Sequence, residues 1–273
     1  MIAFGGWLRA RLCRSGSFEH SWTSPRGGPW SCTSIYDAYL GYRWPDNARA
    51  EPFDAVSARF DTLATELRDA VARQDPAAFR APALAVLSWG RVAGSVRALD
   101  AFWDTLPDSL RRLDPAVADL EDLNHISMNS SWTKLYHLLL DGFPIYDGRV
   151  GAALAYLVRR YLEEHGSRRV PTTLRFGWTD ARRRSDGGPH RDPGSPAIRF
   201  PRLPANPLLH ARCNVMAAWL LGQLVDAPCL APLPPARRIR ALEAALFMIG
   251  YDLPTNWPGD PPPPSRAAPA PPS

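Results

Sequence analysis

The chain of 273 residues holds 32 lysines and arginines, and only one of them, Lys134, is a lysine. Ser130, Ser131 and Thr133 are typical helix N-cap residues, and they stand at the start of a predicted short helix over residues 132–140. Lys134 therefore falls in the first turn, where the helix dipole disfavours positive charge by ~0.3–1 kcal/mol. The dipole and burial both lower the pKa of an amine, and a neutral amine is a nucleophile.

Asp147 is the second residue that could do chemistry, because it precedes a predicted amphipathic helix over residues 148–165. An aspartate in that place is a natural N-cap. The helix over 132–140 advances about 12–13 Å, and residues 141–146 span at most about 20 Å. The chain can therefore run along the first helix and return. We expect Asp147 to lie near Lys134, each at the N-terminal end of its own helix.

The residues around this pair resemble a known family. Ser130-Ser131-Trp132-Thr133-Lys134 is similar to the SSW-x-K motif of bacterial proteins with the 8-oxoguanine DNA glycosylase fold, which belong to the helix–hairpin–helix superfamily. Ile145-Tyr146-Asp147-Gly148-Arg149-Val150 is similar to their IYD-x-RV motif, and EAALFMIGY (243–251) to their closing helix. The specific resemblance covers about 120–165 and a weaker one continues to about 251, with no match before residue 80.

The resemblance implies a DNA glycosylase of base excision repair that removes an oxidised purine, such as 8-oxoguanine, from double-stranded DNA. Such an enzyme flips the damaged base into a pocket. Lys134 would attack C1′ of the sugar and form a Schiff base, and Asp147 would stabilise positive charge on the sugar and assist proton transfer. Strand cleavage by β-elimination, an AP-lyase activity, would follow. This chemistry requires no metal and no organic cofactor.

The segment before Lys134 is the candidate DNA-binding segment. In the resemblance, residues 127–132 correspond to the hairpin, which makes Asn129, Ser130 and Ser131 candidate DNA-binding residues. SMNSSW contains no glycine, so Asn129 is the residue we expect in the left-handed conformation. Arg149, in the first turn of its predicted helix, is a further candidate for contact with a DNA phosphate.

Three aromatic residues, Trp132, Trp89 and Phe143, are candidates for stacking on a flipped base. Large aromatic residues at helical spacing also form hydrophobic cores, and that alternative stays open for each of them. His125 and His137 lie near the motif without metal-ligand spacing. We therefore expect both histidines to be structural and predict no metal site.

A predicted loop over residues 180–196 carries a basic cluster of Arg182, Arg183, Arg184, His190 and Arg191. These side chains either contact DNA phosphates or belong to a solvated loop. The net charge of +5 and the pI near 9.3 are compatible with a polyanionic partner. The excess is mild, since 27 acidic residues offset the basic ones.

The four cysteines, Cys13, Cys32, Cys213 and Cys229, show no C-x-x-C spacing, which argues against a zinc ribbon and an iron–sulfur loop. We expect buried free thiols in a reducing cytoplasm. No apolar stretch approaches 18 residues and the N-terminus lacks the pattern of a signal peptide, so no membrane partner is expected. The predicted location is cytoplasmic, associated with the bacterial nucleoid.

The overall pattern predicts a mainly α, helix–hairpin–helix glycosylase-like bundle in four parts. They are an irregular N-terminal arm (1–50, with one short helix over 33–42), a helical subdomain (51–125), a catalytic region (126–253) and a disordered Pro-rich tail (254–273). Helices are predicted over 54–74, 81–90, 96–106 (ended by Pro107), 109–124, 208–226 and 236–250, with a short strand over 174–178.

Two other functions stay open. The glycine-free segment 127–132 favours a catalytically inactive nucleic-acid-binding protein of the same fold. The Pro-rich tail, in which nine of twenty residues are proline, favours a helical protein-interaction module. DNA binding without base release would indicate the first alternative, and no DNA binding at low salt would indicate the second.

Overall fold

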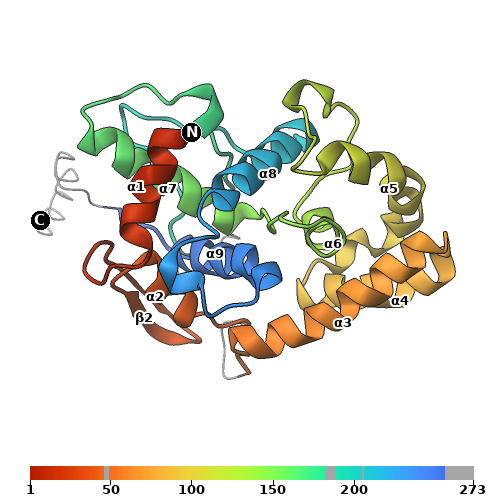
Figure 1. Cartoon of the computed structure of the whole chain (residues 1–273). Helices are drawn as coiled ribbons and strands as arrows, with labels where there is room; N and C mark the ends of the chain where they lie inside the picture. The colour runs from red at the N-terminus through yellow and green to blue at the C-terminus, as the bar shows by residue number, and fades with distance from the viewer. Residues whose placement is uncertain (46–48, 182–187, 205, 256–273) are drawn as a thin grey trace, which may run out of the picture.

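The structure is a computed structural model that describes residues 1–45, 49–181, 188–204 and 206–255. Helices dominate this part of the chain and its sheet is a two-stranded hairpin, which confirms the mainly α prediction (Figure 1). The elements are α1 Ile2–Leu12, β1 His20–Ser24, β2 Gly28–Cys32, α2 Ile35–Leu40, α3 Phe53–Ala72, α4 Pro76–Trp89, η1 Ala93–Ala98, α5 Leu99–Leu113, η2 Leu120–Asp122, α6 Trp132–Leu139, α7 Gly148–Glu164, η3 Thr172–Leu174, α8 Pro207–Gly222, η4 Pro228–Leu230 and α9 Pro235–Ile249.

The buried apolar side chains form two hydrophobic clusters. The terminal core joins α1, the β1–β2 hairpin and α2 to α7 and α9, and the central core is built by α3, α4, α5 and α6. Helix α8 serves both cores, with Met216 and Leu220 in the terminal core and Val215 and Ala218 in the central core. In Figure 1 the terminal core occupies the left half of the molecule and α3–α6 the right half.

The predicted irregular arm over residues 1–50 is wrong, because this segment forms α1, a β-hairpin and α2. Phe4, Trp7 and Leu8 bury one face of α1, and Trp7 and Phe4 both lie against Tyr161 of α7. In the antiparallel hairpin, Trp22 pairs with Trp30 and their rings stack. The arm is therefore part of the terminal core. Of its predicted elements, the short helix over 33–42 is confirmed as α2.

Helices α3, α7, α8 and α9 confirm the predicted helices, and α4 ends at Gly90 as expected although it begins earlier, at Pro76. Pro107 does not end α5, which continues to Leu113. Pro107 lies on the exposed side of the helix, and the buried face continues past it with Ser109 and Leu113. The burial of that face outweighs the backbone hydrogen bond that proline cannot donate.

The stretch before α6 is less helical than expected. The prediction of a helix over 109–124 is wrong beyond Leu113, because residues 114–131 form turns and the single 3₁₀ turn η2. LRFGW (174–178) is not a strand: it begins at the end of η3, and Trp178 forms an isolated bridge with Arg202. The loop predicted over 180–196 is confirmed for its described residues.

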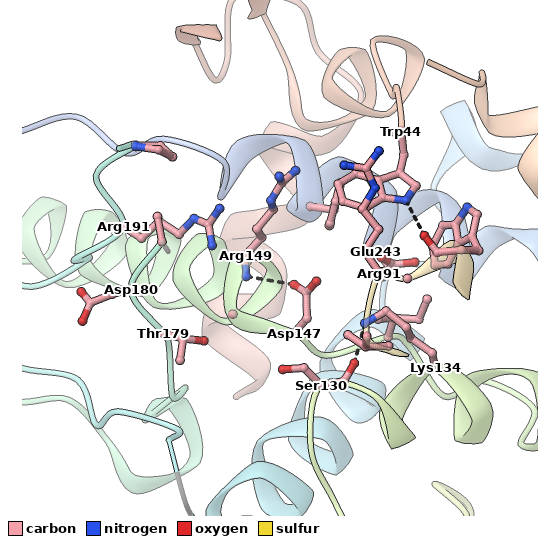
Figure 2. Close-up of a pocket in the computed structure, with 18 of the residues that line it drawn as sticks. Trp44, Arg91, Ser130, Lys134, Asp147, Arg149, Thr179, Asp180, Arg191 and Glu243 are labelled. Atoms are coloured by element: carbon pink, nitrogen blue, oxygen red, sulfur yellow. Dashed lines mark hydrogen bonds between the residues drawn. The ribbon is translucent and has the colours of Figure 1, made fainter. Parts of the chain in front are cut away.

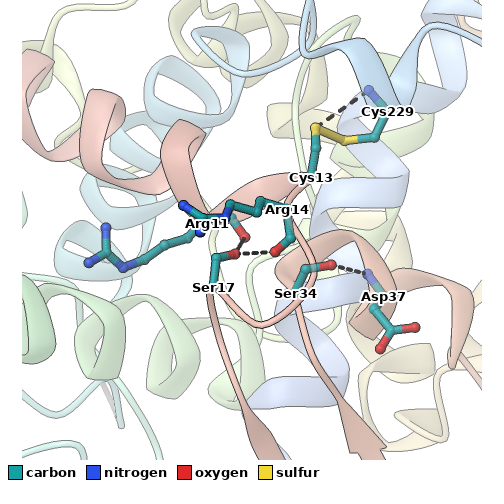
Figure 3. Close-up of a disulfide and its surroundings, with 7 residues drawn as sticks. All are labelled: Arg11, Cys13, Arg14, Ser17, Ser34, Asp37 and Cys229. Atoms are coloured by element: carbon teal, nitrogen blue, oxygen red, sulfur yellow. Dashed lines mark hydrogen bonds between the residues drawn. A yellow bond between two sulfur atoms is a disulfide. The ribbon is translucent and has the colours of Figure 1, made fainter.

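A disulfide joins Cys13, at the C-terminal end of α1, to Cys229 in η4, so the prediction of four free thiols is wrong for this pair (Figure 3). The two cysteines are separated by 216 positions, and spacing along the chain carries no sign of their pairing. The bridge ties the first helix to the segment that leads into α9. Cys32 and Cys213 are free and buried, as expected.

None of the described helices has the length and apolar character that crossing a bilayer requires. The predicted Pro-rich tail lies outside the described residues from residue 256 onward. The cytoplasmic, nucleoid-associated location stays a prediction.

Candidate active site

Helix α6 begins beside Lys134, but its N-terminus is capped differently from the prediction. The side-chain Oδ1 of Asn129 accepts hydrogen bonds from the backbone N–H groups of Ser131 (2.7 Å) and Trp132 (3.0 Å). The Ser131 hydroxyl makes no capping bond and instead accepts a hydrogen bond of 2.6 Å from the Ser95 hydroxyl. The expected left-handed conformation of Asn129 is wrong, because its φ is not positive. The Asn129 side chain thus binds the backbone N–H groups at the start of α6.

Lys134 is buried, with 5% of its surface exposed. Its Nζ donates a hydrogen bond of 2.5 Å to the backbone oxygen of Ser130. The aliphatic part of its side chain packs against Gly90, at the C-terminal end of α4. Burial lowers the pKa of the Lys134 amine more than the negative charges of Asp147 and Glu243 raise it. The amine is therefore shifted towards its neutral form.

Asp147 caps α7 as predicted. Its Oδ1 accepts hydrogen bonds from the backbone N–H groups of Arg149 (2.9 Å) and Val150 (3.2 Å). Burial raises the pKa of the Asp147 carboxyl. The charges of Lys134 and Arg149 and the two backbone hydrogen bonds lower this pKa by a larger amount, so the net shift is downward. Asp147 is therefore held as a carboxylate at the N-terminus of a 17-residue helix.

Lys134 and Asp147 line one pocket of about 520 Å³, so the structure brings the two residues together (Figure 2). Helix α6 carries the amine and the start of α7 carries the carboxylate, each on a different hydrophobic core. No ion pair joins Lys134 to a carboxylate in the described part of the chain. Further walls come from Tyr42, Trp44, Trp89, Gly90, Arg91, Val92, Ser130, Ile145, Gly148, Arg149, Thr179, Asp180, Ala181, Pro189, Arg191, Glu243 and Phe247.

Glu243 is a pocket residue that the sequence did not single out. It lies on α9, has 6% of its surface exposed and borders the pocket that contains Lys134. Burial raises the pKa of its carboxyl to about 8, against the opposing pull of Arg240. A charged residue on the apolar face of a predicted helix is a signal that could have found it.

Arg149, the predicted phosphate contact, borders the same pocket within a group of aromatic rings. Its guanidinium lies 4.3 Å from the ring centre of Phe247, 4.8 Å from that of Tyr251 and 5.3 Å from that of Trp44. The Arg91 guanidinium lies 5.6 Å from the ring of Trp44. Two cations therefore flank one tryptophan at the pocket wall. Trp44 and Arg91 were not predicted as site residues.

Of the three stacking candidates, Trp89 alone lines the pocket, where its backbone oxygen accepts a hydrogen bond of 3.1 Å from the Trp44 indole. The other two candidates belong to the central core, so their prediction as pocket residues is wrong. Trp132 is 3% exposed and stacks on Phe102 at 4.4 Å. Phe143 is 1% exposed. Their side chains bury apolar surface from which a base is excluded.

The three residues before Lys134 that were predicted to bind DNA lie in different environments. Ser130 lines the pocket and Asn129 is exposed, whereas Ser131 is buried with 6% of its surface exposed. Arg191 borders the pocket, and its Nε donates a hydrogen bond of 3.2 Å to the Tyr251 backbone oxygen. His190 does not line this pocket.

The remaining predicted residues lie away from the pocket or outside the part of the chain that the structure describes. His190 binds the side chain of Asp252 through its backbone N–H. His137 contacts the backbone oxygen of Phe143 at 2.6 Å and burial lowers its pKa to about 3, a structural role as expected. Among the described residues, no group of three or more acidic, histidine or cysteine side chains is placed to hold a metal ion. Arg182, Arg183 and Arg184 lie outside the described residues.

Comparison with known proteins gives no relative: the chain matches no protein-family model, no curated protein and no solved structure at a significant level.

Proposed function

We propose that this protein is a DNA glycosylase that removes an oxidised purine, such as 8-oxoguanine, from double-stranded DNA through a Schiff base on Lys134. The observation that carries the proposal is a buried lysine amine at a helix start, in one pocket with the helix-capping carboxylate of Asp147. We propose as well that the chain has the helix–hairpin–helix glycosylase fold that its motifs resemble, and that it acts at the nucleoid.

The environment of Lys134 suits a nucleophile. Burial shifts the amine towards the neutral form, and only that form carries the lone pair that attacks carbon. The packing of Gly90 and the hydrogen bond to the Ser130 oxygen hold the side chain in one orientation. In the proposed reaction, Nζ bonds to C1′ of the sugar while the bond from C1′ to the base breaks.

Asp147 suits the second role. Attack at C1′ develops positive charge on the sugar ring, and a fixed carboxylate stabilises such charge most effectively in a site from which water is excluded. The two backbone hydrogen bonds to Oδ1 hold the carboxyl group in place before the substrate arrives. The downward shift of its pKa keeps it charged at neutral pH.

The pocket suits a flipped purine nucleotide. Its volume of about 520 Å³ falls in the range of small-ligand sites. Trp44, Trp89 and Phe247 are aromatic residues among its walls. Arg91, Arg149 and Arg191 supply positive charge around the same space, which favours the phosphates that flank the flipped base.

Borohydride trapping tests the proposal. Purified protein is mixed with duplexes that carry 8-oxoguanine or an abasic site and is then reduced. We expect a covalent protein–DNA band that Lys134→Gln abolishes. Lys134 is the only lysine, so the N-terminal amine is its sole competitor among the chain's primary amines. Absence of both the band and base release would refute the proposed reaction.

One observation favours a second candidate function, a nucleic-acid-binding protein without activity. Backbone N–H groups near the predicted hairpin would grip a DNA phosphate, but those of Ser131 and Trp132 already donate to the Asn129 side chain. Tight binding to duplex DNA with neither base release nor trapping, for each of several lesions, would support this function.

A further inference from the structure

Glu243 is a buried acid at the wall of the pocket. It is 6% exposed, and its carboxyl forms no hydrogen bond or ion pair with any residue of the described chain. A mostly buried acid with no hydrogen-bond partner is costly even where the charges of Arg240 and Lys134 offset part of the cost, so its presence requires an explanation. The residue lies at the pocket wall, and Figure 2 places its side chain near those of Lys134 and Asp147. The Glu243 side chain therefore lies on the same side of the pocket wall as Lys134 and Asp147, the proposed reacting groups.

The structure assigns to Glu243 a role as the proton donor to the departing base, an inference that rests on the proposed function. Neither Lys134 nor Asp147 forms an ion pair with it, so the space between these side chains stays open to a substrate. Asp147 is a poor donor, because it is held as a carboxylate. Glu243 is a buried acidic side chain that lines the pocket with Lys134, whereas Asp180 is exposed and paired with Arg202.

The protonation state of Glu243 follows from the groups that face it. Arg240, on its own helix, and Lys134, on α6, favour its ionised form, while Asp147, at the start of α7, disfavours it. Tyr42, after α2, also lies within electrostatic range and stays neutral because burial raises its pKa. Burial outweighs the two cations and raises the Glu243 pKa to about 8. The acid and the Lys134 amine are thus both shifted towards their neutral forms, the pair that the reaction needs.

The proposed step balances as follows. Nζ of Lys134 bonds to C1′ as the bond from C1′ to the base nitrogen breaks, and the electron pair of that bond leaves with the base. The Glu243 proton passes to the base nitrogen, which leaves a Glu243 carboxylate beside the new secondary ammonium of Lys134. Transfer of one ammonium proton back to Glu243 restores the acid. The Nζ lone pair then forms a double bond to C1′ as the bond from C1′ to O4′ breaks, and O4′ takes up a solvent proton.

Glu243→Gln separates this role from that of Lys134, because glutamine keeps the shape but cannot transfer the proton. With a duplex containing 8-oxoguanine, we expect single-turnover base release to slow by about 10²-fold or more. With a preformed abasic site, where no base leaves, we expect trapping by borohydride to stay within about two-fold of wild type. Glu66→Gln, at an exposed position on α3, is the matched control and leaves both readings unchanged.

The pH profile supplies a second reading. Wild-type base release should decline as pH rises through about 8, and the Glu243→Gln variant should lack that decline. Base release by Glu243→Gln at the wild-type rate would overturn the assignment. An equal loss of base release and abasic-site trapping would also overturn it, since Glu243 would then act by positioning Lys134. If wild-type protein shows neither activity, the proposed function itself fails, and the two failures are therefore distinguishable.

Discussion

Gly90 and Lys134 are packed so closely that residue 90 has no room for a side chain. A Cβ on residue 90 would lie 2.6 Å from both Cδ and Cε of the lysine. Gly90 follows the last residue of α4, while Lys134 lies in the first turn of α6. The end of one helix therefore sets the path of the candidate nucleophile on another.

Gly90→Ala should impair the reaction without unfolding the protein. The added methyl group forces the Lys134 side chain to move, and a displacement of about 1 Å at a reacting group can cost about 10²-fold in rate. We expect a drop of at least ~10-fold in borohydride trapping at an abasic site. Densitometry of the covalent band measures the effect.

Gly6→Ala is the matched control, because a Cβ at residue 6 meets nothing within 4 Å and the residue is exposed in α1. This variant should trap DNA like wild type, with stability raised by about 0.5–1 kcal/mol. Equal trapping by both glycine variants would show that Gly90 does not set the position of the lysine.

Substitutions of Asp147 should separate capping from chemistry. Asn caps helices about as well as Asp, so Asp147→Asn should keep α7 while base release falls by roughly 10²-fold. Asp147→Ala loses the cap as well and should be less stable than Asp147→Asn by about 1 kcal/mol. Urea unfolding and single-turnover kinetics measure the two effects. Wild-type kinetics in Asp147→Asn would remove the carboxylate from the mechanism.

Glu243 should make stability depend on pH. An unfolded glutamate titrates near ~4.3, and the folded pKa is about 8. Between these values the folded state binds a proton that the unfolded state does not, so this contribution to stability is full below pH ~4 and is lost as pH rises towards 8. The slope is at most about 1.4 kcal/mol per pH unit.

Urea unfolding of wild type and Glu243→Gln at pH 5.5 and pH 7.5 tests this expectation. The glutamine does not titrate, so the free energy of unfolding of wild type should fall relative to the variant at the higher pH. Parallel behaviour of the two proteins across this interval would contradict a raised folded-state pKa.

The disulfide should be detectable by counting thiols. In denaturant without reductant, maleimide should add to Cys32 and Cys213, and after reduction all four cysteines should react. Mass spectrometry reads the adducts directly. Reduction should lower the free energy of unfolding by about 2–4 kcal/mol, because the bridge closes a long loop. Cys13→Ser should remove this sensitivity to reductant, and four adducts without reduction would refute the bridge.

The sequence was most informative where one face of a helix is apolar. Phe60, Leu63 and Leu67 recur at helical spacing, and α3 follows within two residues of the predicted range. Pro107 misled the prediction because its local effect is opposed by burial elsewhere on α5, which no local rule contains. In α1, Gly5 and Gly6 weaken the helical signal, and packing against α7 compensates for them.

The residues of the candidate site were also only partly predictable from the sequence. Lys134 and Asp147 could be paired from the sequence because a short return of the chain connects them and each stands at a helix start. Trp44, Arg91 and Glu243 come from distant segments, and their convergence depends on how α4, α7 and α9 pack. Trp132 and Phe143 show the converse error, because aromatic type alone does not tell a pocket wall from a core.

The two hydrophobic cores have a consequence for how the protein loses activity. The amine projects from the central core and the carboxylates from the terminal core, so neither core holds a complete site. Loosening of either one separates the reacting groups before the whole chain unfolds. The reaction rate under mild denaturant therefore reports on the less stable of the two hydrophobic cores. Inactivation should occur at a lower denaturant concentration than the global unfolding transition measured by circular dichroism.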